Sequence, residues 1–380
     1  MKKILFISTR NPFSGRYSGD VIRSLKIVNF LKKKYNLDIL CLGKKGELKN
    51  KNMNILAFND SNFFFKIFYC IVSLLKFEPI QFGLFYSREM KKYLREYAYQ
   101  YDCLFFYHIR SSQYLPTNFR GKTIIEMGDL YSENYLQTFN NLNIFNPLKY
   151  IYLLESILVT KTEKKIFSNF DKVTLFSKNE AQKINLKIKG KIHQVDECID
   201  IVKNKYKFSK DNFRILFIGN LNYLPNFLAC KDFIKNDLPF LKKKIPQIKF
   251  SIIGNVTKLR KFLLSGKPEV EVLGFKKDIS KYIKNTICGL ANLKIATGVQ
   301  VKVLTYMSFG LPVVCSKKVS KNFGGSVLSF HNNKELHKVI YELKSKKIKS
   351  NKFSQKSLKL SKSLNWKKIR RTYLELISAQ

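Results

Sequence analysis

Residues 293–314, LKIATGVQVKVLTYMSFGLPVV, combine a glycine turn and two lysines in an order that suits a phosphate group. An apolar strand end precedes Gly298, a short helix follows it, and Lys294 and Lys302 flank the turn. A glycine turn that leads into a helix leaves unpaired backbone N–H groups at the positive end of the helix dipole. The segment therefore predicts a cradle for a nucleotide diphosphate. Simple solvation of the two lysines is the alternative in a chain this rich in lysine.

A second candidate anion site lies in STRNPFSGRYSGDVIRS, residues 8–24. Gly15 and Gly19 separate the first expected strand from a helix that begins at Asp20 or Val21, and glycines there let a backbone approach a ligand closely. Three arginines surround the loop and could clamp an anion: Arg10, Arg16 and Arg23. The spacing is not GxGxxG, so a dinucleotide fingerprint is absent. An ordinary loop between strand and helix is the alternative.

The stretch ILFIGNLNYLPNFLACKDFI, residues 215–234, opens a second series of strands and helices. Gly219 ends a strand and Pro225 precedes a helix. Neutral hydrogen-bonding groups stand at the carboxyl edge of this strand: Asn220, Asn222 and Asn226. Helix capping and turn formation explain some of these asparagines whatever the function.

Short apolar runs alternate with helical patterns in both halves of the chain, which predicts parallel sheets covered on both faces. Strands are expected at 4–8, 37–43, 53–58, 103–108, 122–127 and 172–177, and then at 214–219, 249–254, 270–275, 287–293, 312–316 and 326–330. The fold class is therefore α/β, with two Rossmann-like domains facing across a cleft, and such open sheets bind ligands at the carboxyl ends of their strands. We expect the first domain at 1–199, a lysine-rich linker at 200–213, the second domain at 214–360, and a C-terminal helix at 361–380 that crosses back to the first domain.

The charge of the chain restricts its partners. Its 380 residues carry a formal net charge of +43, which attracts nucleic acid, an anionic lipid surface or phosphorylated substrates. The seven cysteines have no CxxC spacing, and no histidine spacing supports a metal site. Four cysteines lie in apolar strand-like runs and are interpreted as reduced core residues of a cytosolic protein: Cys41, Cys103, Cys288 and Cys315. The apolar run at 63–75 is too short to span a bilayer, so it predicts a buried or membrane-surface helix.

Four motifs in one order carry a resemblance to a known family: GDVIRS at 19–24, FIGNLNYLPN at 217–226, VLGFKKDISKYI at 272–283 and the cradle at 293–314. The chain resembles the GT-B glycosyltransferases of group 1 (family 4), in particular the branch of bacterial exopolysaccharide and envelope sugar transferases. The resemblance covers nearly the whole chain. It implies a C-terminal domain that binds a nucleotide sugar, UDP- or GDP-linked, and an N-terminal domain that binds a saccharide or lipid-linked acceptor. It also implies hexosyl transfer with retention of configuration and without a metal or other cofactor.

The resemblance further implies roles for individual residues. Backbone amides around Gly298–Val301 would hold the diphosphate, and Lys294 and Lys302 match the family's basic residues on either side of the turn, where they would stabilise the leaving group. The set implied for the donor is Gly219, Asn220, Asn222, Lys294, Thr297, Gly298, Val299, Gln300, Val301, Lys302 and Thr305. His108 would position the sugar at the reacting carbon, although an isolated histidine is as often a packing residue. The acceptor side would comprise Gly15, Gly19, Asp20, Arg23, Arg110, Glu126 and Asp129, with helix capping by Asp129 or Ser132 as the alternative for the last stretch.

Two positions in the cradle depart from the family. The broad family carries a Glu-x7-Glu pair, where this chain has Thr297 and Thr305. A threonine at 305 can make one hydrogen bond to a ribose hydroxyl but no charge-assisted bidentate contact. We therefore expect nucleotide binding that is weaker by about 1–2 kcal/mol.

Three functions stay open on the sequence alone. The first is a glycosyltransferase, cytoplasmic and peripheral at the inner face of the plasma membrane, where its positive charge holds it to anionic lipid. The second is a degenerate, non-catalytic relative that serves as a binding or partner subunit, which the two threonines motivate. The third is a nucleic-acid-binding protein, which the charge alone motivates. No recognised RNA motif, zinc finger or helix-turn-helix supports it, so we expect no specific nucleic acid partner.

Overall fold

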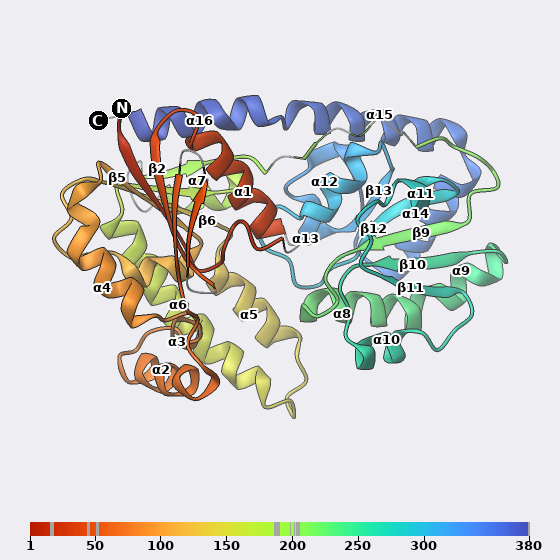
Figure 1. Ribbon diagram of the computed structural model, residues 1–380. Coiled ribbons are helices and arrows are strands. Elements are labelled where there is room, and N and C mark those ends of the chain that lie inside the picture. Colours follow the sequence, from red (N-terminus) through yellow and green to blue (C-terminus); the bar gives the residue numbers. More distant parts are fainter. Residues whose placement is uncertain are drawn as a thin grey trace. The chain divides into compact units, whose positions relative to one another are not determined.

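The chain divides into two compact units, and each is described by itself. The computed structural model describes residues 1–15, 19–43, 46–50, 53–185, 191–197, 199–200, 202 and 206–378. Unit 1 contains residues 1–196 and 369–380, and unit 2 contains residues 197–368 (Figure 1). The C-terminal segment therefore belongs to the same unit as the N-terminus.

Unit 1 is built on one sheet whose strands are parallel except at one edge. Its strands are β1 (Lys3–Ser8), β2 (Asn36–Leu42), β3 (Gly46–Asn50), β4 (Met53–Phe58), β5 (Cys103–Tyr107), β6 (Lys122–Gly128), β7 (Lys172–Leu175) and β8 (Ile192–Gln194). Within the described residues they form the order β3-β4-β2-β1-β5-β6-β7-β8, and only β3 runs antiparallel to its neighbour. The central strands β1 and β5 are apolar and buried along almost their whole length, as a sheet covered on both faces requires, and Phe6 stacks on Phe105 at 5.5 Å.

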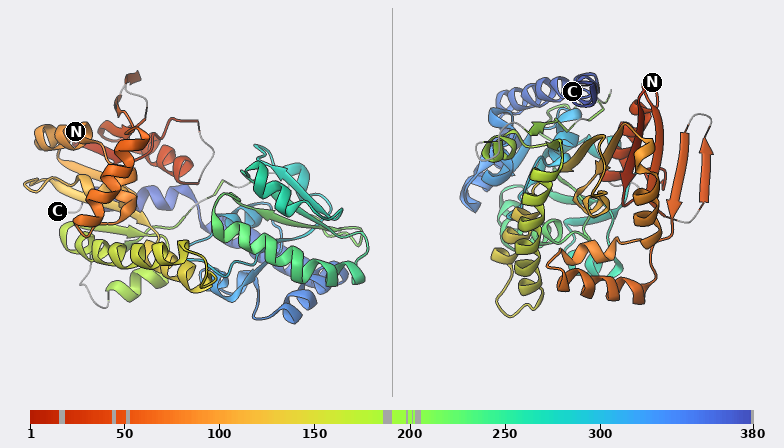
Figure 2. Two further views of the ribbon diagram at one scale, coloured as in Figure 1. Left: turned by 90° about the horizontal axis from the view of Figure 1, so that it is seen from below. Right: turned by 90° about the vertical axis from the view of Figure 1, so that its left-hand side faces the viewer.

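Helices cover both faces of this sheet (Figures 1 and 2). They are α1 (Gly19–Leu31), α2 (Phe63–Leu75), α3 (Ile80–Leu84), α4 (Arg88–Tyr97), α5 (Tyr131–Asn141), α6 (Leu148–Asn169), α7 (Lys178–Asn185) and α16 (Trp366–Ser378), with short 3-10 turns at Ala98–Gln100 and Ile109–Tyr114. Helix α16 buries Ile369, Tyr373 and Ile377 in unit 1, and the Lys2 ammonium donates to the Ile377 carbonyl oxygen at 3.3 Å.

Two buried glutamates of α6 hold the amino ends of neighbouring helices. The Glu155 carboxylate accepts the backbone N–H groups of Ile80 (2.8 Å) and Gln81 (3.2 Å) at the start of α3. Glu163 accepts the backbone N–H (3.2 Å) and hydroxyl (2.5 Å) of Ser132 in α5. Burial raises the pKa of both carboxyls, that of Glu163 to about 7, while these hydrogen bonds oppose the rise. The sequence 148–169 thus forms one long helix whose acids position two others.

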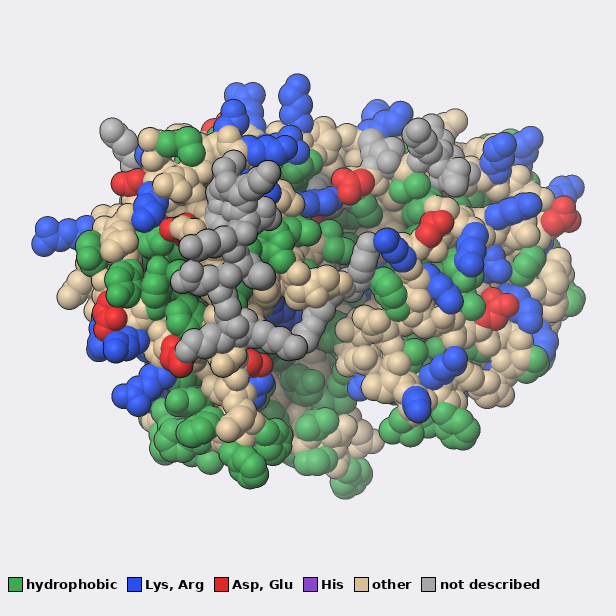
Figure 3. All heavy atoms as spheres, viewed as in Figure 1, with side chains coloured by type: hydrophobic (Ala, Val, Ile, Leu, Met, Phe, Trp, Pro, Cys, Tyr) green, Lys and Arg blue, Asp and Glu red, His purple; other side chains and the backbone are tan. Residues whose placement is uncertain are grey.

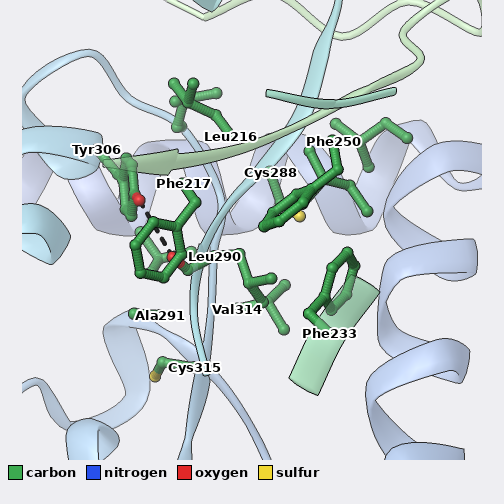
Figure 4. Packing of buried hydrophobic residues seen from close by; sticks show 14 of the residues in the cluster. Leu216, Phe217, Phe233, Phe250, Cys288, Leu290, Ala291, Tyr306, Val314 and Cys315 are labelled. Atoms are coloured by element: carbon green, nitrogen blue, oxygen red, sulfur yellow. Dashed lines mark hydrogen bonds between the residues drawn. The ribbon is translucent and has the colours of Figure 1, made fainter. Parts of the chain in front are cut away.

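Unit 2 repeats the plan with a smaller sheet. Its strands are β9 (Arg214–Ile218), β10 (Lys249–Ile253), β11 (Val270–Gly274), β12 (Thr286–Ala291), β13 (Val313–Ser316) and β14 (Leu328–Phe330). In the described part of the chain they pair in the order β11-β10-β9-β12-β13-β14, all parallel. Phe217, Phe233 and Phe250 fill the space beside β9 and β10, and the last two rings lie 4.6 Å apart (Figure 4).

The helices of unit 2 also follow the strands in turn. They are α8 (Leu224–Asp232), a π-helical turn (Phe233–Asp237), α9 (Leu238–Lys244), α10 (Lys258–Leu264), α11 (Ser280–Ile283), α12 (Val301–Ser308), α13 (Lys317–Ser320), a 3-10 turn (Gly324–Ser326), α14 (Asn333–Ser345) and α15 (Lys347–Ser363). Residues 361–380, expected as one helix, therefore contain the end of α15 and then α16. Of the helices within the described residues, none combines the length and apolar character needed to cross a membrane.

The structure confirms the expected fold class of two Rossmann-like α/β units. Every expected strand is present, with ends that differ by up to two residues, and the segment expected at 326–330 begins with a 3-10 turn before β14. Two short strands were not expected, β3 and β8. Strand β3 is polar in sequence and pairs antiparallel at the edge of the sheet, so it lacks the apolar run of a buried parallel strand. Cys41, Cys103, Cys288 and Cys315 are buried and free, as expected for core residues.

Candidate active site

The turn predicted as a phosphate cradle joins β12 to α12 in unit 2. Gly298 has a φ of 58°, the left-handed region that suits glycine, and its carbonyl oxygen accepts from the Asn322 amide. Gln300 is the N-cap of α12, and its side chain donates to the Thr297 carbonyl oxygen at 2.9 Å instead of satisfying a helix N–H group. No side chain therefore caps α12, although the Val303 N–H already donates to the Gln300 carbonyl oxygen at 2.9 Å.

Lys302 lies on the buried face of α12, and a neutral amide holds its ammonium group. Only 8% of Lys302 is exposed, its Nζ donates to the Asn226 Oδ1 at 2.6 Å, and it lies 4.1 Å from the centroid of the Phe217 ring. Burial lowers the pKa of Lys302 to about 7. Burial therefore disfavours the charged form of this amine.

The contact between Lys302 and Asn226 brings together two motifs that are far apart in the sequence. Asn226 donates to the Asn220 carbonyl oxygen at 2.9 Å, and it packs so closely under Gly219 that a Cβ there would lie 2.9 Å from its side-chain nitrogen. The Asn222 carboxamide oxygen accepts from the Thr257 N–H at 3.0 Å. The asparagines thus shape the loop after β9, which was the simpler reading of their sequence, and one of them also binds the cradle lysine.

Tyr306, which the sequence analysis did not single out, fixes α12 to the sheet. Its hydroxyl accepts from the Ile218 N–H at 2.7 Å and donates to the Leu290 carbonyl oxygen at 3.1 Å (Figure 4). The ring lies against Gly289, where a Cβ would come within 2.3 Å of it. The sequence signal is the i, i+4 spacing of Lys302 and Tyr306, which places both on one face of a helix.

The other predicted donor residues have more exposed or different surroundings. Lys294 is 3.1 Å from the Asp232 carboxylate, and 66% of its side chain is exposed. The Thr305 hydroxyl donates back to the Val301 carbonyl oxygen at 3.0 Å, while Thr297 is buried. Val299 packs against the core of unit 2. The structure therefore places Lys302 in contact with Asn226 in the first turn of α8, and Lys294 beside Asp232 at the end of the same helix.

In unit 1, His108 follows β5 with a backbone conformation that is rare for a residue with a side chain. Its φ is 76°, and its ring hydrogen-bonds the Tyr131 hydroxyl. Burial and the nearby Arg110 and Arg10 charges lower the pKa of His108 to about 3, against an opposing effect of Asp20. The imidazole is therefore neutral at pH 7. Strained backbone of this kind clusters at functional sites, which supports the choice of His108.

His108 shares a small pocket with three residues of the first loop and of the turn after β5: Arg10, Asp20 and Arg110. Arg10 and Asp20 form an ion pair across the start of α1. Gly15 has a φ of 69° and open space around it, Gly19 begins α1, and Arg16 lies outside the described residues.

Arg110 is oriented by α3. Its Nε donates to the Gln81 side-chain oxygen at 2.8 Å, and its guanidinium lies 4.4 Å from the Phe85 ring centroid. Gln81 was not found from the sequence, because it is 29 residues from Arg110 and carries no motif.

Arg23 and Glu126 form a buried ion pair. Their side chains are 3% and 1% exposed, and Arg23 Nε lies 2.5 Å from Glu126 Oε1. Tyr373 of α16 donates to the Glu126 carboxylate and accepts from Arg23 at 3.0 Å, and the guanidinium also donates to the Asp196 carbonyl oxygen at 3.2 Å. The structure thus places two predicted acceptor residues in a network that holds the C-terminal helix to unit 1.

Asp129 lies between β6 and α5, half-buried. Neither Asp129 nor Ser132 is the N-cap of α5, which is Leu130. Ser132 instead binds Glu163, as described above. Among the residues that the structure describes, no group of three or more His, Cys, Asp or Glu side chains is placed to hold a metal ion.

Comparisons with known proteins agree with this geometry. Residues 212–341, which include the cradle and the loop after β9, match the family described as "Glycosyl transferases group 1". A relative in Klebsiella pneumoniae, described as an uncharacterized 44.6 kDa protein in the cps region, is 27% identical over 274 residues. That alignment covers 67% of this chain and 65% of the relative, slightly less than two thirds of the relative's length.

Solved structures share the fold over the whole chain. Anabaena HepE in complex with UDP and glucose matches with a TM-score of 0.66 at 13% identity, with 100% of both chains covered. S. aureus TarM, in a complex that includes UDP, matches with a TM-score of 0.66 at 10% identity and the same coverage. A UDP-forming trehalose-phosphate synthase from Burkholderia vietnamiensis gives 0.68 at 9% identity, with 100% of this chain and 98% of that chain covered. The chain therefore has the GT-B fold, and its residues 212–341 are similar to the group 1 glycosyltransferases.

Proposed function

We propose that this protein transfers a sugar from a UDP-linked donor to a saccharide or lipid-linked acceptor in the synthesis of an envelope polysaccharide. The observation that carries the proposal is the cradle of unit 2: a left-handed turn at Gly298, a helix start, and the buried Lys302 held by a neutral amide. The family match supports sugar transfer, UDP in HepE and TarM supports UDP over GDP, and the relative from a cps region supports the polysaccharide.

Lys302 and the first turn of α12 are the groups that would bind the donor. A diphosphate beside Lys302 stabilises the protonated amine, because the opposite charge offsets the cost of burial. The same charge then stabilises the nucleoside diphosphate as it leaves, together with the helix N–H groups. We propose that the transfer retains the configuration at the sugar and needs no metal ion.

His108 would act as a neutral hydrogen-bonding group toward a sugar hydroxyl. Its pKa of about 3 excludes an imidazolium at pH 7, so it can orient a hydroxyl without adding charge. Arg110, in the same pocket, is the group we assign to an anionic part of the acceptor. The remaining predicted donor and acceptor residues stay predictions. We place the chain on the cytoplasmic side of a membrane, with anionic lipid and no specific nucleic acid as partner, on the grounds of its charge and proposed substrates.

The first test is thermal stabilisation of the purified protein by UDP, GDP, ADP, TDP and CMP. We expect UDP to raise the melting temperature and the Lys294→Ala/Lys302→Ala double variant to lose that rise. A rise in melting temperature with GDP alone would indicate a GDP-linked donor in place of the UDP-linked one. A flat response to every nucleotide at millimolar concentration would contradict the proposal.

A non-catalytic relative is the second candidate, and Thr305 is the observation that favours it. Its hydroxyl donates to a carbonyl oxygen of its own helix. We therefore expect weaker hydrogen bonding to a ribose than the family's glutamate would give. Thr305→Glu is the test. A gain in UDP affinity would show a cradle that still receives a nucleotide, whereas no gain, together with no transfer or hydrolysis of any common sugar nucleotide, would favour the binding subunit.

A further inference from the structure

Helix α2 is almost entirely apolar, and it exposes more than half of its side chains. Of its thirteen residues, all described, Ser73 alone is buried. Phe64 is 81% exposed and Phe68 56%, and Phe77, just after the helix, is 67% exposed. Single exposed apolar residues are common, but a contiguous cluster of this kind marks an interaction surface.

A second exposed apolar segment lies at the start of α6. Phe145 is 90% exposed and Ile157 59%, and several apolar side chains between them also reach solvent. Both segments adjoin α3: a Cβ on Gly83 would lie 2.3 Å from the backbone nitrogen of Cys70 in α2, and Glu155 of α6 binds the start of α3. We call the exposed apolar side chains of 63–77 and 144–157 the apolar face. Figure 3 shows hydrophobic side chains gathered over α2 and over the turn between α5 and α6.

Positive charges predominate around the apolar face, although the Asp60 carboxylate pairs with Lys66 at 2.6 Å and Glu78 follows Phe77. In residues 62–77 and 142–165, all of which are described, every charged side chain that is not buried is a lysine, while the acids Glu155 and Glu163 are buried and bound to backbone. Lys161 also lies 5.4 Å from the Phe77 ring centroid, at the border of the face.

The cationic character continues beyond the face along α6. A groove of about 1190 Å³ borders α6, and its lining extends from Phe82 in α3 to Lys165, Lys122 and Lys172. Burial, and then repulsion by Lys172 and Lys2, lowers the pKa of Lys122, with Cys103 and Asp171 opposing. The groove is also lined by the acids Glu78 and Asp171, so its charge is mixed with lysines in excess.

We propose that the apolar face is a docking surface for an anionic lipid bilayer. Aromatic and aliphatic side chains surrounded by lysines suit the boundary between headgroups and acyl chains, where the rings enter and the lysines contact lipid phosphates. A second copy of this chain fits less well, because a two-fold interface through this face would bring lysines against lysines.

Docking also bears on the acceptor. Gln81 belongs to α3, the helix that both apolar segments contact. Its side chain orients Arg110 in the pocket of His108. The polar head of a lipid-linked acceptor held in the bilayer would therefore lie near α3, the helix that supports the His108 pocket. The acceptor class rests on the proposed function, whereas docking does not, so the two can fail separately.

The test is co-sedimentation of the full chain with vesicles of phosphatidylglycerol and phosphatidylethanolamine. We expect Phe64→Ser/Phe68→Ser and Phe145→Ser/Ile157→Ser each to lower the partition coefficient by at least about tenfold, which is about 1.4 kcal/mol. The matched control is Leu259→Ser/Phe262→Ser in α10 of unit 2, two side chains that are 68% and 78% exposed but lie outside the apolar face. It should change partitioning by less than about twofold. Because all these side chains are exposed, the variants should keep the wild-type melting temperature and UDP response.

Several outcomes would overturn the proposal. Unchanged partitioning of both apolar-face variants would do so, as would equal losses in the control, which would mean that any exposed apolar side chain suffices. Equal binding to vesicles of pure phosphatidylcholine, with no effect of salt, would contradict the preference for anionic lipid. A wild-type dimer in solution that Phe64→Ser/Phe68→Ser dissociates would assign the face to a second copy. Lost partitioning with an intact UDP response would support docking whatever the acceptor proves to be.

Discussion

The two units present a cation beside the first turn of a helix in opposite ways. In unit 1, Arg23 of α1 is buried against a carboxylate, Glu126, and a tyrosine hydroxyl. In unit 2, Lys302 of α12 is also buried, but the group that accepts its hydrogen bond is the neutral amide of Asn226. The first cation is compensated within the protein and has no charge to offer a ligand. The charge of the second cation is not balanced by its neutral amide partner, so a bound anion can balance it.

The difference shows which cations indicate an anion-binding site in a chain whose formal net charge is +43. Most lysines here are solvated, and their number says only that anions are attracted. A buried amine that lacks a carboxylate partner carries an electrostatic cost, and a bound phosphate relieves it. The comparison therefore predicts that the Arg23 pair determines stability and that Lys302 determines nucleotide binding.

Arg23→Met should have the largest effect. It removes the cation that pairs with Glu126, so the buried carboxylate keeps only the hydrogen bond from the Tyr373 hydroxyl among the two contacts described above. Removing one partner of a buried ion pair costs about 3–5 kcal/mol. We expect a lower free energy of unfolding in urea and exposure of α16 to proteolysis.

The double variant Arg23→Met/Glu126→Leu is the control for that change. It removes both charges, so it should lose less stability than either single variant. If Arg23→Met leaves stability unchanged while it abolishes UDP binding, the comparison between the units is wrong.

Lys302→Met should reverse this pattern. The methionine fills similar space and removes an amine whose burial was costly, so the free energy of unfolding should change by no more than about 1 kcal/mol. Loss of a charged hydrogen bond to phosphate should weaken UDP binding by about 1.5–3 kcal/mol, or at least tenfold. Isothermal titration calorimetry with UDP measures the affinity, and urea unfolding measures the stability. Equal UDP affinity in variant and wild type would show that the phosphate does not contact this lysine.

The pH dependence of stability gives a third prediction from the same lysine. Its pKa is about 7 in the folded protein against 10.5 for an ordinary lysine, so between these values the unfolded chain binds one more proton than the folded chain. The stability of the wild type, relative to Lys302→Met, should therefore rise as the pH increases from 7 to 9, by about 2 kcal/mol. Subtracting the variant removes the contribution of the tyrosines and cysteines. A difference that is flat or falls over this range would mean that the amine is not desolvated.

The sequence predicted the strands and the turn because both depend on local composition. Apolar runs mark β1, β5, β9 and β12, and Gly298 marks a left-handed residue before a helix. The hydrogen bond of Lys302 to Asn226 spans 76 residues and the pair of Arg23 with Glu126 spans 103, so no local pattern could distinguish the two cations.

The surroundings of the predicted helix at 63–75 were also beyond the sequence. Its composition gave a helix that fits either a core or a lipid surface. Only packing shows that α2 is exposed, and that the start of α6, which the sequence analysis did not single out, adds to the same face. Burial depends on what covers an element, and that is a property of the whole unit.

Lys294 should give the smallest effect and sharpens the comparison most directly, because it flanks the same turn as Lys302. It is largely exposed and lies 3.1 Å from Asp232, and exposed ion pairs contribute about 0–1 kcal/mol. Lys294→Ala should therefore leave stability nearly unchanged and weaken UDP binding by about two- to threefold at low salt, less as salt rises. Asp232→Asn is the matched variant, since it removes the carboxylate that competes with a phosphate for Lys294 and should strengthen UDP binding slightly. If Lys294→Ala weakens UDP binding as much as Lys302→Met does, burial would not be what separates a binding lysine from a solvated one, and both lysines would have to be assigned to the diphosphate.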